Sequence, residues 1–277
     1  MDELSSREWR LIREQGRSGP MQMALDEVAA ETAADGGPRT VRVYRWTPGT
    51  LSLGYHQEPG TVDWTYCREN GIDVTRRRTG GGGIYHDIVG EISYSITLPS
   101  REVSGDLTES YLELLEPIRT ALEWLDVPVA LAAASRPAIH EPSCYLRELH
   151  PSHDLVVPGA ELPDGNPRKI SGNAQYREDD VVLQHGSLTF SLRPERHLGV
   201  FDDHGVDPAT FRDHVTAIDR HTAAPRHVAV RAIERALGQW AGAYEGSWSQ
   251  LELNRARELA EEKYGTDAWV RDGIEPR

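Results

Sequence analysis

The residues best suited to chemistry form one continuous run, Arg76-Arg77-Arg78-Thr79-Gly80-Gly81-Gly82-Gly83-Ile84-Tyr85-His86-Asp87. Consecutive glycines are costly to order, because glycine loses more backbone freedom on folding than any other residue. They also let a main chain approach an anion closely and point several N–H groups at it. The adjacent arginines add forked donors suited to phosphate or carboxylate. We call residues 80–83 the glycine loop, and the run predicts that it binds an anion.

A flexible linker is the alternative interpretation of the glycine loop. Linkers more often mix glycine with serine, and this loop has apolar strand patterns on both sides, over residues 72–77 and 91–98. These flanking patterns favour a loop held at both ends by a sheet.

Lysine is almost absent from this sequence, because only two of its 30 basic residues, Lys169 and Lys263, are lysines. Where lysine is this rare, we expect each one to be retained for a reason. Lys263 lies near a predicted helix end at Gly265, where a cation serves as a dipole partner and an ion-pair residue. For Lys169 the alternative to a functional role is a solvated lysine on a strand.

The overall composition limits the classes of function. The chain has 277 residues and a net charge of −14, so its bulk surface should repel nucleic acid. An acidic surface with little lysine is typical of adaptation to high salt, where screening suppresses self-repulsion; compositional drift toward arginine is the alternative. No run of about 18 apolar residues predicts a membrane span. The acidic residues 1–4 do not resemble a signal peptide, and the two cysteines suggest no disulfide framework. We expect a cytoplasmic protein without nucleic-acid or membrane partners.

Apolar periodicity predicts strands in the middle of the chain and helices toward its ends. This arrangement indicates an α+β fold with a central mixed, largely antiparallel sheet flanked by helices. Residues 41–46 and 50–55 are expected to pair as a hairpin, and residues 155–157 and 168–173 as another, joined through Asp164-Gly165. Further strands are expected at residues 7–12, 72–77, 91–98, 127–133 and 181–192, and helices at residues 21–36, 62–70, 107–125 (kinked by Pro117), 228–240 and 247–264.

Three segments together resemble a known family. They are Met23-Ala24-Leu25-Asp26-Glu27, the run from Arg77 to Asp87, and Arg168-Lys169-Ile170-Ser171-Gly172-Asn173-Ala174-Gln175 with Leu183-Gln184-His185-Gly186-Ser187 after it. In this order they resemble the lipoate–protein ligase A and octanoyltransferase group of the biotin/lipoate attachment family. The resemblance extends from about residue 21 to residue 269, and it implies a single catalytic domain over residues 1–277.

The resemblance also implies an activity. In this family a medium-chain acid, lipoate or octanoate, is finally joined as an amide to a lysine of a small carrier domain. The carrier would be a lipoyl domain of a 2-oxoacid dehydrogenase or the glycine cleavage H protein. In the ligases, ATP and Mg²⁺ first convert the acid to an acyl-adenylate. The primary expectation is therefore an ATP-dependent lipoate–protein ligase, and a non-catalytic relative that holds the acyl-adenylate is a further alternative.

Carried over residue by residue, the resemblance implies a set of binding residues. The acyl and phosphate path would be bounded by Arg78, Gly80, Gly81, Gly82, Gly83, Tyr85, His86, Gly172, Asn173 and Ala174. Lys169 would reach the acyl carbonyl and the α-phosphate. A preorganised cation there stabilises the oxyanion of the transition state more than the ground state, and arginine, being larger and rigid, would not replace it well. Nothing in the sequence predicts a metal site among these residues.

Cys144 is the residue on which the alternatives depend. One branch of octanoyltransferases has a nucleophilic cysteine in a similar place, before a Pro-Ser pair and the lysine strand, and takes octanoate from acyl-carrier protein without ATP. Here residues 146–150 lengthen that spacing. The other interpretations are a packed or surface thiol, or a zinc site with His140, His150 and His153, whose spacings match no standard motif. Cys67, on a predicted helix, is expected to be buried packing.

Many ligases of this group continue into a C-terminal accessory domain, whereas this sequence ends soon after Trp269. We therefore expect no accessory domain within residues 1–277. The expectation is that a separate chain supplies that part or that the enzyme does not need it.

Overall fold

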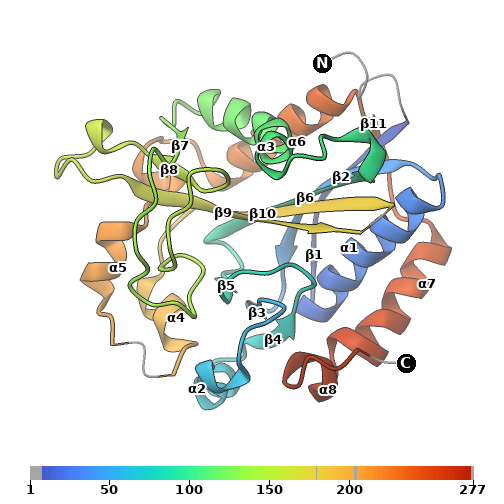
Figure 1. Ribbon diagram of the computed structural model, residues 1–277, viewed down its shortest axis with the longest axis horizontal. Coiled ribbons are helices and arrows are strands. Elements are labelled where there is room, and N and C mark those ends of the chain that lie inside the picture. The colour runs from blue at the N-terminus through green and yellow to red at the C-terminus, as the bar shows by residue number, and fades with distance from the viewer. Residues whose placement is uncertain (1–7, 179, 203–204, 276–277) are drawn as a thin grey trace.

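The computed structural model describes residues 8–178, 180–202 and 205–275, and two β-sheets organise it (Figure 1). The larger sheet has eight strands in the order β11-β1-β2-β6-β10-β9-β8-β7. In it β1 pairs in parallel with β2 and β11, and the remaining pairings are antiparallel. The strands are β1 (Trp9–Arg17), β2 (Arg39–Trp46), β6 (Glu91–Pro99), β7 (Ala130–Leu131), β8 (Leu155–Val157), β9 (Arg168–Arg177), β10 (Val181–Thr189) and β11 (Tyr244–Glu245).

Helices cover both faces of the larger sheet, which confirms the predicted α+β class (Figure 1). α3 (Leu107–Glu123) and α6 (Arg226–Ala241) cover one face, while α1 (Gly19–Ala34) and α7 (Gln250–Leu259) lie on the other. The short helices are α2 (Trp64–Glu69), α4 (Pro194–Gly199), α5 (Pro208–His214) and α8 (Asp267–Val270). None of the described helices is long and apolar enough to cross a membrane.

The two faces of the central strands differ in chemistry, because successive side chains of a strand point to opposite faces. On β6, Ile92 and its apolar neighbours two, four and six residues on are buried against α3 and α6 in the main core. The alternate residues of β6, such as Ser93 and Ser95, face α1 and are buried as well. One face of the sheet is therefore an apolar core, and the other carries buried polar groups.

A smaller sheet, in the order β4-β3-β5, lies beside that polar face. β3 (Thr50–Leu53) pairs in parallel with β4 (Asp73–Arg76) and antiparallel with β5 (Ile84–His86). The glycine loop connects β4 to β5, so both of its ends are fixed by one sheet. The linker interpretation does not describe this arrangement.

Several predicted elements differ from the structure. β3 does not form a hairpin with β2, because Leu51 and Leu53 bury themselves in a separate core around the small sheet. The strand expected over residues 127–133 is reduced to β7, since Pro128 has no N–H to give a ladder. The pattern at 181–192 is one strand, and the last predicted helix is α7 followed by a π-helical turn, Ala260–Tyr264. Arg7, the expected start of the first strand, lies outside the described residues.

The second predicted hairpin is confirmed, because β8 pairs antiparallel with β9. The predicted long helices at 21–36, 107–125 and 228–240 are present as α1, α3 and α6. α3 continues through Pro117 to its end at Glu123, and the kink there stays a prediction. Cys67 is buried among apolar side chains, as expected.

Arg76 joins the glycine loop's own sheet to the C-terminal segment. Its guanidinium is buried and donates to backbone carbonyls from two distant stretches of chain. The acceptors are Gly54 O at 2.9 Å, Tyr55 O at 2.8 Å, Gln57 O at 2.9 Å, Trp269 O at 3.0 Å and Val270 O at 3.1 Å. The indole of Trp269 donates back to Arg76 O at 2.8 Å. A single side chain therefore satisfies the carbonyls that bring α8 against β4.

We predict that Arg76→Met lowers the free energy of unfolding by about 2–4 kcal/mol, because several buried carbonyls lose their only charged donor. Chemical unfolding of the variant and the wild type measures this. Arg255→Met is the matched control: Arg255 is exposed on α7 and pairs with Glu31 at 2.9 Å, so its loss should cost less than about 1 kcal/mol. Equal losses in the two variants would contradict this account of Arg76.

Candidate active site

A cavity of about 280 Å³ lies between the polar face of the larger sheet, the small sheet and the irregular segment 134–154. The glycine loop contributes Gly80, Gly81 and Gly82 to its wall. β9 contributes Lys169 and residues 172–174, and β10 contributes residues 185–187. Cys144 comes from the irregular segment. The cavity thus brings together the three sequence segments that carried the family resemblance.

The backbone around Cys144 is hydrogen-bonded directly to the glycine loop. Gly83 N–H donates to Pro142 O at 2.7 Å, and Cys144 N–H donates to Gly83 O at 2.8 Å. A Cβ atom on Gly82 would lie 2.9 Å from Cys144 N and 2.8 Å from Pro142 O, so this close approach requires glycine. The glycine loop is therefore the support on which the cysteine is placed.

Lys169 lies beside Cys144, with its ammonium group enclosed. Its Nζ is 2.7 Å from Asp154 Oδ1 and donates to Cys144 O at 3.0 Å. A Cβ on Gly172 would be 2.9 Å from Cys144 Sγ and 3.8 Å from Lys169 Nζ, so the thiol and the ammonium flank the same glycine. Glycine at position 172 leaves room for both groups.

The protonation of Lys169 follows from these neighbours. Burial on its own lowers the pKa of Lys169, but the nearby charges of Asp154 and Cys144 outweigh burial and leave the pKa raised. Lys169 is therefore an ammonium ion at neutral pH. It is not the solvated strand lysine that was the alternative, because only 5% of its surface is exposed.

Most of the predicted binding residues line the cavity, but three do not. The lining residues are Gly80, Gly81, Gly82, His86, Gly172, Asn173 and Ala174. Gly83 lies behind the wall, where a Cβ would meet Gln57 and Phe201. Tyr85 is buried in the core of the small sheet, with its hydroxyl on Arg196 Nη1 at 3.0 Å.

Arg78 is the clearest difference from the expected site. Its guanidinium lies over the Tyr176 ring at 4.2 Å and contacts Glu178 at 2.7 Å, away from the cavity. Arg77 lines the cavity instead and is buried. Three adjacent arginines are alike in sequence, so only the path of the chain decides which of them faces inward.

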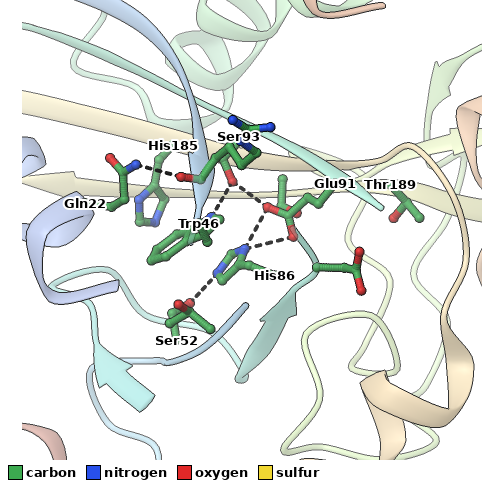
Figure 2. A network of polar contacts seen from close by, with 12 residues as sticks. Gln22, Trp46, Ser52, His86, Glu91, Ser93, His185 and Thr189 are labelled. Carbon is green, nitrogen blue, oxygen red and sulfur yellow. Dashed lines mark hydrogen bonds and ion pairs between the residues drawn. The ribbon is translucent and has the colours of Figure 1, made fainter. Parts of the chain in front are cut away.

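A buried polar network lies behind the cavity wall at His86 (Figure 2). His86 Nδ1 contacts Glu91 Oε1 at 2.7 Å, and Ser52 Oγ contacts His86 Nε2 at 2.8 Å. The imidazole stacks on the Trp46 indole with centroids 4.0 Å apart, and Trp46 Nε1 donates to Ser93 Oγ at 2.8 Å. Ser93 Oγ in turn donates to Glu91. His86 is thus fixed on both ring nitrogens and on one ring face.

The histidines near Cys144 are not gathered around a metal. His150 and His153 stack with centroids 4.5 Å apart, and His140 packs against Phe201 at 5.5 Å. Among the residues that the structure describes, no group of three or more His, Cys, Asp or Glu side chains could hold a metal ion. Burial lowers the pKa of His153, and Lys169 and His150 add to that effect.

Sequence reasoning missed several residues that the cavity needs. Asp154 had a usable signal, since it directly precedes the strand predicted to pair with the lysine strand. Arg77 had a signal too, as an immediate neighbour of the predicted Arg78. Asp26 had a signal as well, because it lies in the first of the three segments that carried the resemblance. Ser52 and Glu91 had none, because they come from separate elements and are of common types.

Comparison with known proteins identifies the relatives of this chain. Residues 18–240 match the profile of the family described as the lipoyl protein ligase A/B catalytic domain. The octanoyltransferase LipM of Symbiobacterium thermophilum is 32% identical over 275 residues, covering 94% of this chain and 97% of the relative. The octanoyltransferase LipM of Carboxydothermus hydrogenoformans is 30% identical over 277 residues, covering 95% and 98%.

Solved structures share the fold. A bipartite lipoate protein ligase of Thermoplasma acidophilum, studied with its E2 lipoyl domain, superposes with a TM-score of 0.79 at 23% identity, covering 98% of this chain and 99% of that one. A lipoate–protein ligase A bound with ATP superposes with a TM-score of 0.77 at 23% identity, covering 96% and 100%. The predicted fold family is confirmed, and the two relatives by sequence described above are named octanoyltransferases.

We predict that Asp154→Asn destabilises the protein by about 3 kcal/mol near neutral pH, because it leaves a buried ammonium ion without its carboxylate. The wild-type pKa of Lys169 is raised above 10.5, so its contribution is complete below that value and is lost only at higher pH. In the variant, burial lowers this pKa, so stability is regained as pH rises and Lys169 loses its proton. The deficit should therefore be smaller at about pH 9.5 than at about pH 6.5 in urea unfolding.

Asp164→Asn is the control, because Asp164 forms an exposed ion pair with Arg168 in the loop of the same hairpin. It should leave stability almost unchanged at both pH values. A deficit for Asp154→Asn that does not vary with pH would mean that Lys169 is not the group concerned.

Proposed function

We propose, from the premise that this chain belongs to the lipoyl protein ligase A/B catalytic domain family, that it is a cysteine-dependent octanoyltransferase. It would transfer octanoate from acyl-carrier protein to a lysine of a lipoyl carrier domain. The observation that carries the proposal is the Cys144 thiol in the cavity, beside Gly172 and Lys169. The expectation of an ATP-dependent ligase is revised accordingly, because relatives of nearly full length are named octanoyltransferases.

In the first half-reaction, the Cys144 thiolate attacks the carbonyl carbon of the octanoyl thioester. A new C–S bond to Cys144 forms, the C–S bond to the donor breaks, and the donor sulfur leaves as a thiolate. The Lys169 ammonium, which contacts Asp154 and Cys144 O, has a third N–H that can be directed at the reacting atoms. It supplies the proton for the leaving thiolate, and the product is octanoyl-Cys144.

In the second half-reaction, the amine of the carrier lysine attacks octanoyl-Cys144. The amide C–N bond forms, the C–S bond to Cys144 breaks, and the attacking nitrogen loses a proton to the neutral Lys169 amine. This restores the Cys144 thiolate and the Lys169 ammonium, so protons balance over the cycle. The glycine loop would lie along the acyl group, and its N–H groups are suited to the oxyanion of each tetrahedral intermediate.

In this reaction the pKa of Lys169 depends on whether Cys144 is a thiolate or a thioester. After the charge of Asp154, the Cys144 charge is the next influence that raises the pKa of Lys169. Acylation removes that negative charge, so the pKa of Lys169 falls when the thioester forms. The pKa of Lys169 is therefore higher before the first step, which keeps Lys169 charged. It is lower as the thioester forms, which favours donation of its proton.

We predict that the purified chain, given the octanoyl thioester of acyl-carrier protein and an unmodified lipoyl domain, modifies that domain without ATP. Mass spectrometry of the lipoyl domain measures the product. Cys144→Ala should lower the rate by at least about 10³-fold, and Lys169→Ala by about 10²–10⁴-fold. Cys67→Ala is the matched control, since its buried thiol lies in the core of the small sheet. Without the lipoyl domain, the octanoyl group should be found on the Cys144 peptide.

A parallel reaction with lipoate or octanoate, ATP and Mg²⁺ distinguishes the ligase. Modification that requires ATP and survives Cys144→Ala would overturn the transferase proposal and restore the ligase. No modification from either donor would favour the non-catalytic alternative. Because each reaction uses the purified chain alone, activity would also support the proposal that these 277 residues need no accessory chain.

We further propose that the acidic surface reflects a salt-rich cytoplasm. With a net charge of −14, the chain should repel an acidic carrier domain over long range, and screening should relieve this. The rate of transfer should therefore rise as KCl is increased toward about 1 M, where the Debye length is about 3 Å. A rate that is highest without added salt would contradict the proposal.

A further inference from the structure

Arg77 is a buried guanidinium that faces the cavity without a carboxylate beside it. Its Nη2 donates to Gly80 O at 2.8 Å and to Gly82 O at 2.7 Å, and its Nη1 donates to Ser52 O at 2.8 Å. Among the described residues, no carboxylate oxygen is recorded within the 4.0 Å of an ion pair with it. This is unlike the other cations of the site, because Lys169 contacts Asp154 directly.

Two side-chain relays lead away from Arg77 in parallel. In the first, Arg77 Nη1 donates to Ser52 Oγ at 3.3 Å. Ser52 then contacts His86 Nε2 at 2.8 Å, and His86 Nδ1 contacts Glu91 at 2.7 Å (Figure 2). In the second, Arg77 Nε donates to Thr79 Oγ1 at 3.0 Å, and Thr79 contacts His185 Nε2 at 2.7 Å. His185 Nδ1 then contacts Asp26 Oδ2 at 3.3 Å. Each relay is a hydroxyl, an imidazole and a carboxylate in the same order.

Donor chemistry limits the proton positions in both relays. Arginine has no acceptor, so each hydroxyl oxygen accepts from Arg77. With a second lone pair and its own proton, each hydroxyl can then either accept from or donate to the imidazole Nε2. In both relays the imidazole Nδ1 lies against the carboxylate, where a proton on Nδ1 is donated to it. For Asp26, burial raises the pKa, but Arg42 at 2.6 Å and His185 outweigh it, so the pKa is lowered and the carboxylate is ionised. Burial lowers the pKa of His185, which keeps that ring neutral.

Gly82 links Arg77 to Cys144. The guanidinium donates to Gly82 O, and the Cα of the same glycine packs on Cys144 N, where a Cβ would lie at 2.9 Å. Arg77 and Cys144 also line the same cavity. The guanidinium therefore stands on the glycine-loop side of the cysteine, whereas Lys169 stands on the β9 side.

We propose that the Ser52–His86–Glu91 and Thr79–His185–Asp26 relays are positioning devices that hold Arg77 as a second cation for the Cys144 thiolate. A carboxylate in contact with Arg77 would cancel most of its field at the sulfur. Relays through an imidazole fix the guanidinium while keeping both carboxylates two side chains away. The inference rests on the proposed function in one respect, that Cys144 reacts as a thiolate.

Other charged and titratable groups also face Cys144, and they set the background against which Arg77 acts. Lys169 approaches from β9 and Asp154 from the start of β8, while the segment of Cys144 itself brings further groups to the cavity. These further groups are Arg147, Glu148, His150 and His153. Among the described residues, the side chains of Ser52 and Thr79 are hydrogen-bonded to Arg77, His86 and His185 and to none of these further groups, so a change in either relay leaves them in place.

The test is the pH dependence of Cys144 alkylation by iodoacetamide in the full chain, measured by mass spectrometry of the Cys144 peptide. The midpoint of the wild type is the reference for every variant. Thr79→Val and Ser52→Ala should each raise the midpoint, and the double variant or Arg77→Gln should raise it by about one pH unit. Thr79→Ser keeps the hydroxyl, so it should restore the wild-type midpoint.

A structural role alone would move the melting temperature of Thr79→Val and leave the midpoint unchanged, and that result overturns the proposal. An equal shift in Thr79→Val and Thr79→Ser also overturns it, because the hydroxyl would then be irrelevant. If Arg77→Gln does not fold, the matched Thr79 pair still decides. Alkylation needs no acyl donor, so a wild type that transfers no octanoate refutes the proposed function without affecting this measurement.

Discussion

The chemistry of the cavity depends on one close backbone contact, where Gly82 and Gly83 lie against Pro142 and Cys144. Segment 134–154 contains neither helix nor strand among its described residues, so a regular element does not place the cysteine. Its position comes instead from two backbone hydrogen bonds to the glycine loop and from the ion pair of Asp154 with Lys169. Any side chain at position 82 would separate the thiol's segment from the loop, and the thiol would leave Gly172. The cost of ordering four glycines is therefore offset by a contact that no other residue allows.

Buried cations are the second constraint, and the fold compensates them in three ways. Arg42 contacts Asp26 at 2.6 Å, and Lys169 contacts Asp154 at 2.7 Å. Among the described residues, the side chain of Arg76 donates hydrogen bonds only to backbone carbonyls, which hold it between the small sheet and the C-terminal segment. The side chain of Arg77 donates to backbone carbonyls and to side-chain hydroxyls. The charge of a cation is least available to the cavity where a carboxylate touches it, so the way in which each one is compensated decides which can act on a bound anion.

The sequence was sufficient for the fold class, the β8–β9 hairpin and the family, because these follow from local patterns. It also indicated that Lys169 and the glycine loop lie at one cavity, because lysine is rare in this chain. It was not sufficient to choose among Arg76, Arg77 and Arg78. Their side chains reach partners that lie up to 195 residues away, and nothing local distinguishes them. The pairing of β3 was mistaken for a related reason: a short turn favours a hairpin, but the apolar side chains of β3 found a core formed by residues from 62 to 201. The relay residues come from α1, β3, β5, β6 and β10 and from the residue just before the glycine loop, so only the folded chain brings them together.

The rarity of lysine takes on a physical meaning in the structure. Both lysines are buried: Lys169 beside Cys144, and Lys263 between Glu27 at 3.0 Å and Glu275 at 2.5 Å. The ion-pair role expected for Lys263 is confirmed. Elsewhere arginine serves as the cation, and its delocalised guanidinium stays charged at neutral pH. An ammonium ion is compact and can give up its proton when a neighbouring charge disappears, and in the proposed reaction acylation of Cys144 removes such a charge. The same lysine in a cavity without a thiol could only neutralise an anion brought by the substrate, such as the phosphate of an adenylate. With a thiol beside it, its charge acts first on the enzyme's own sulfur, and an acyl group that arrives as a thioester needs no adenylate.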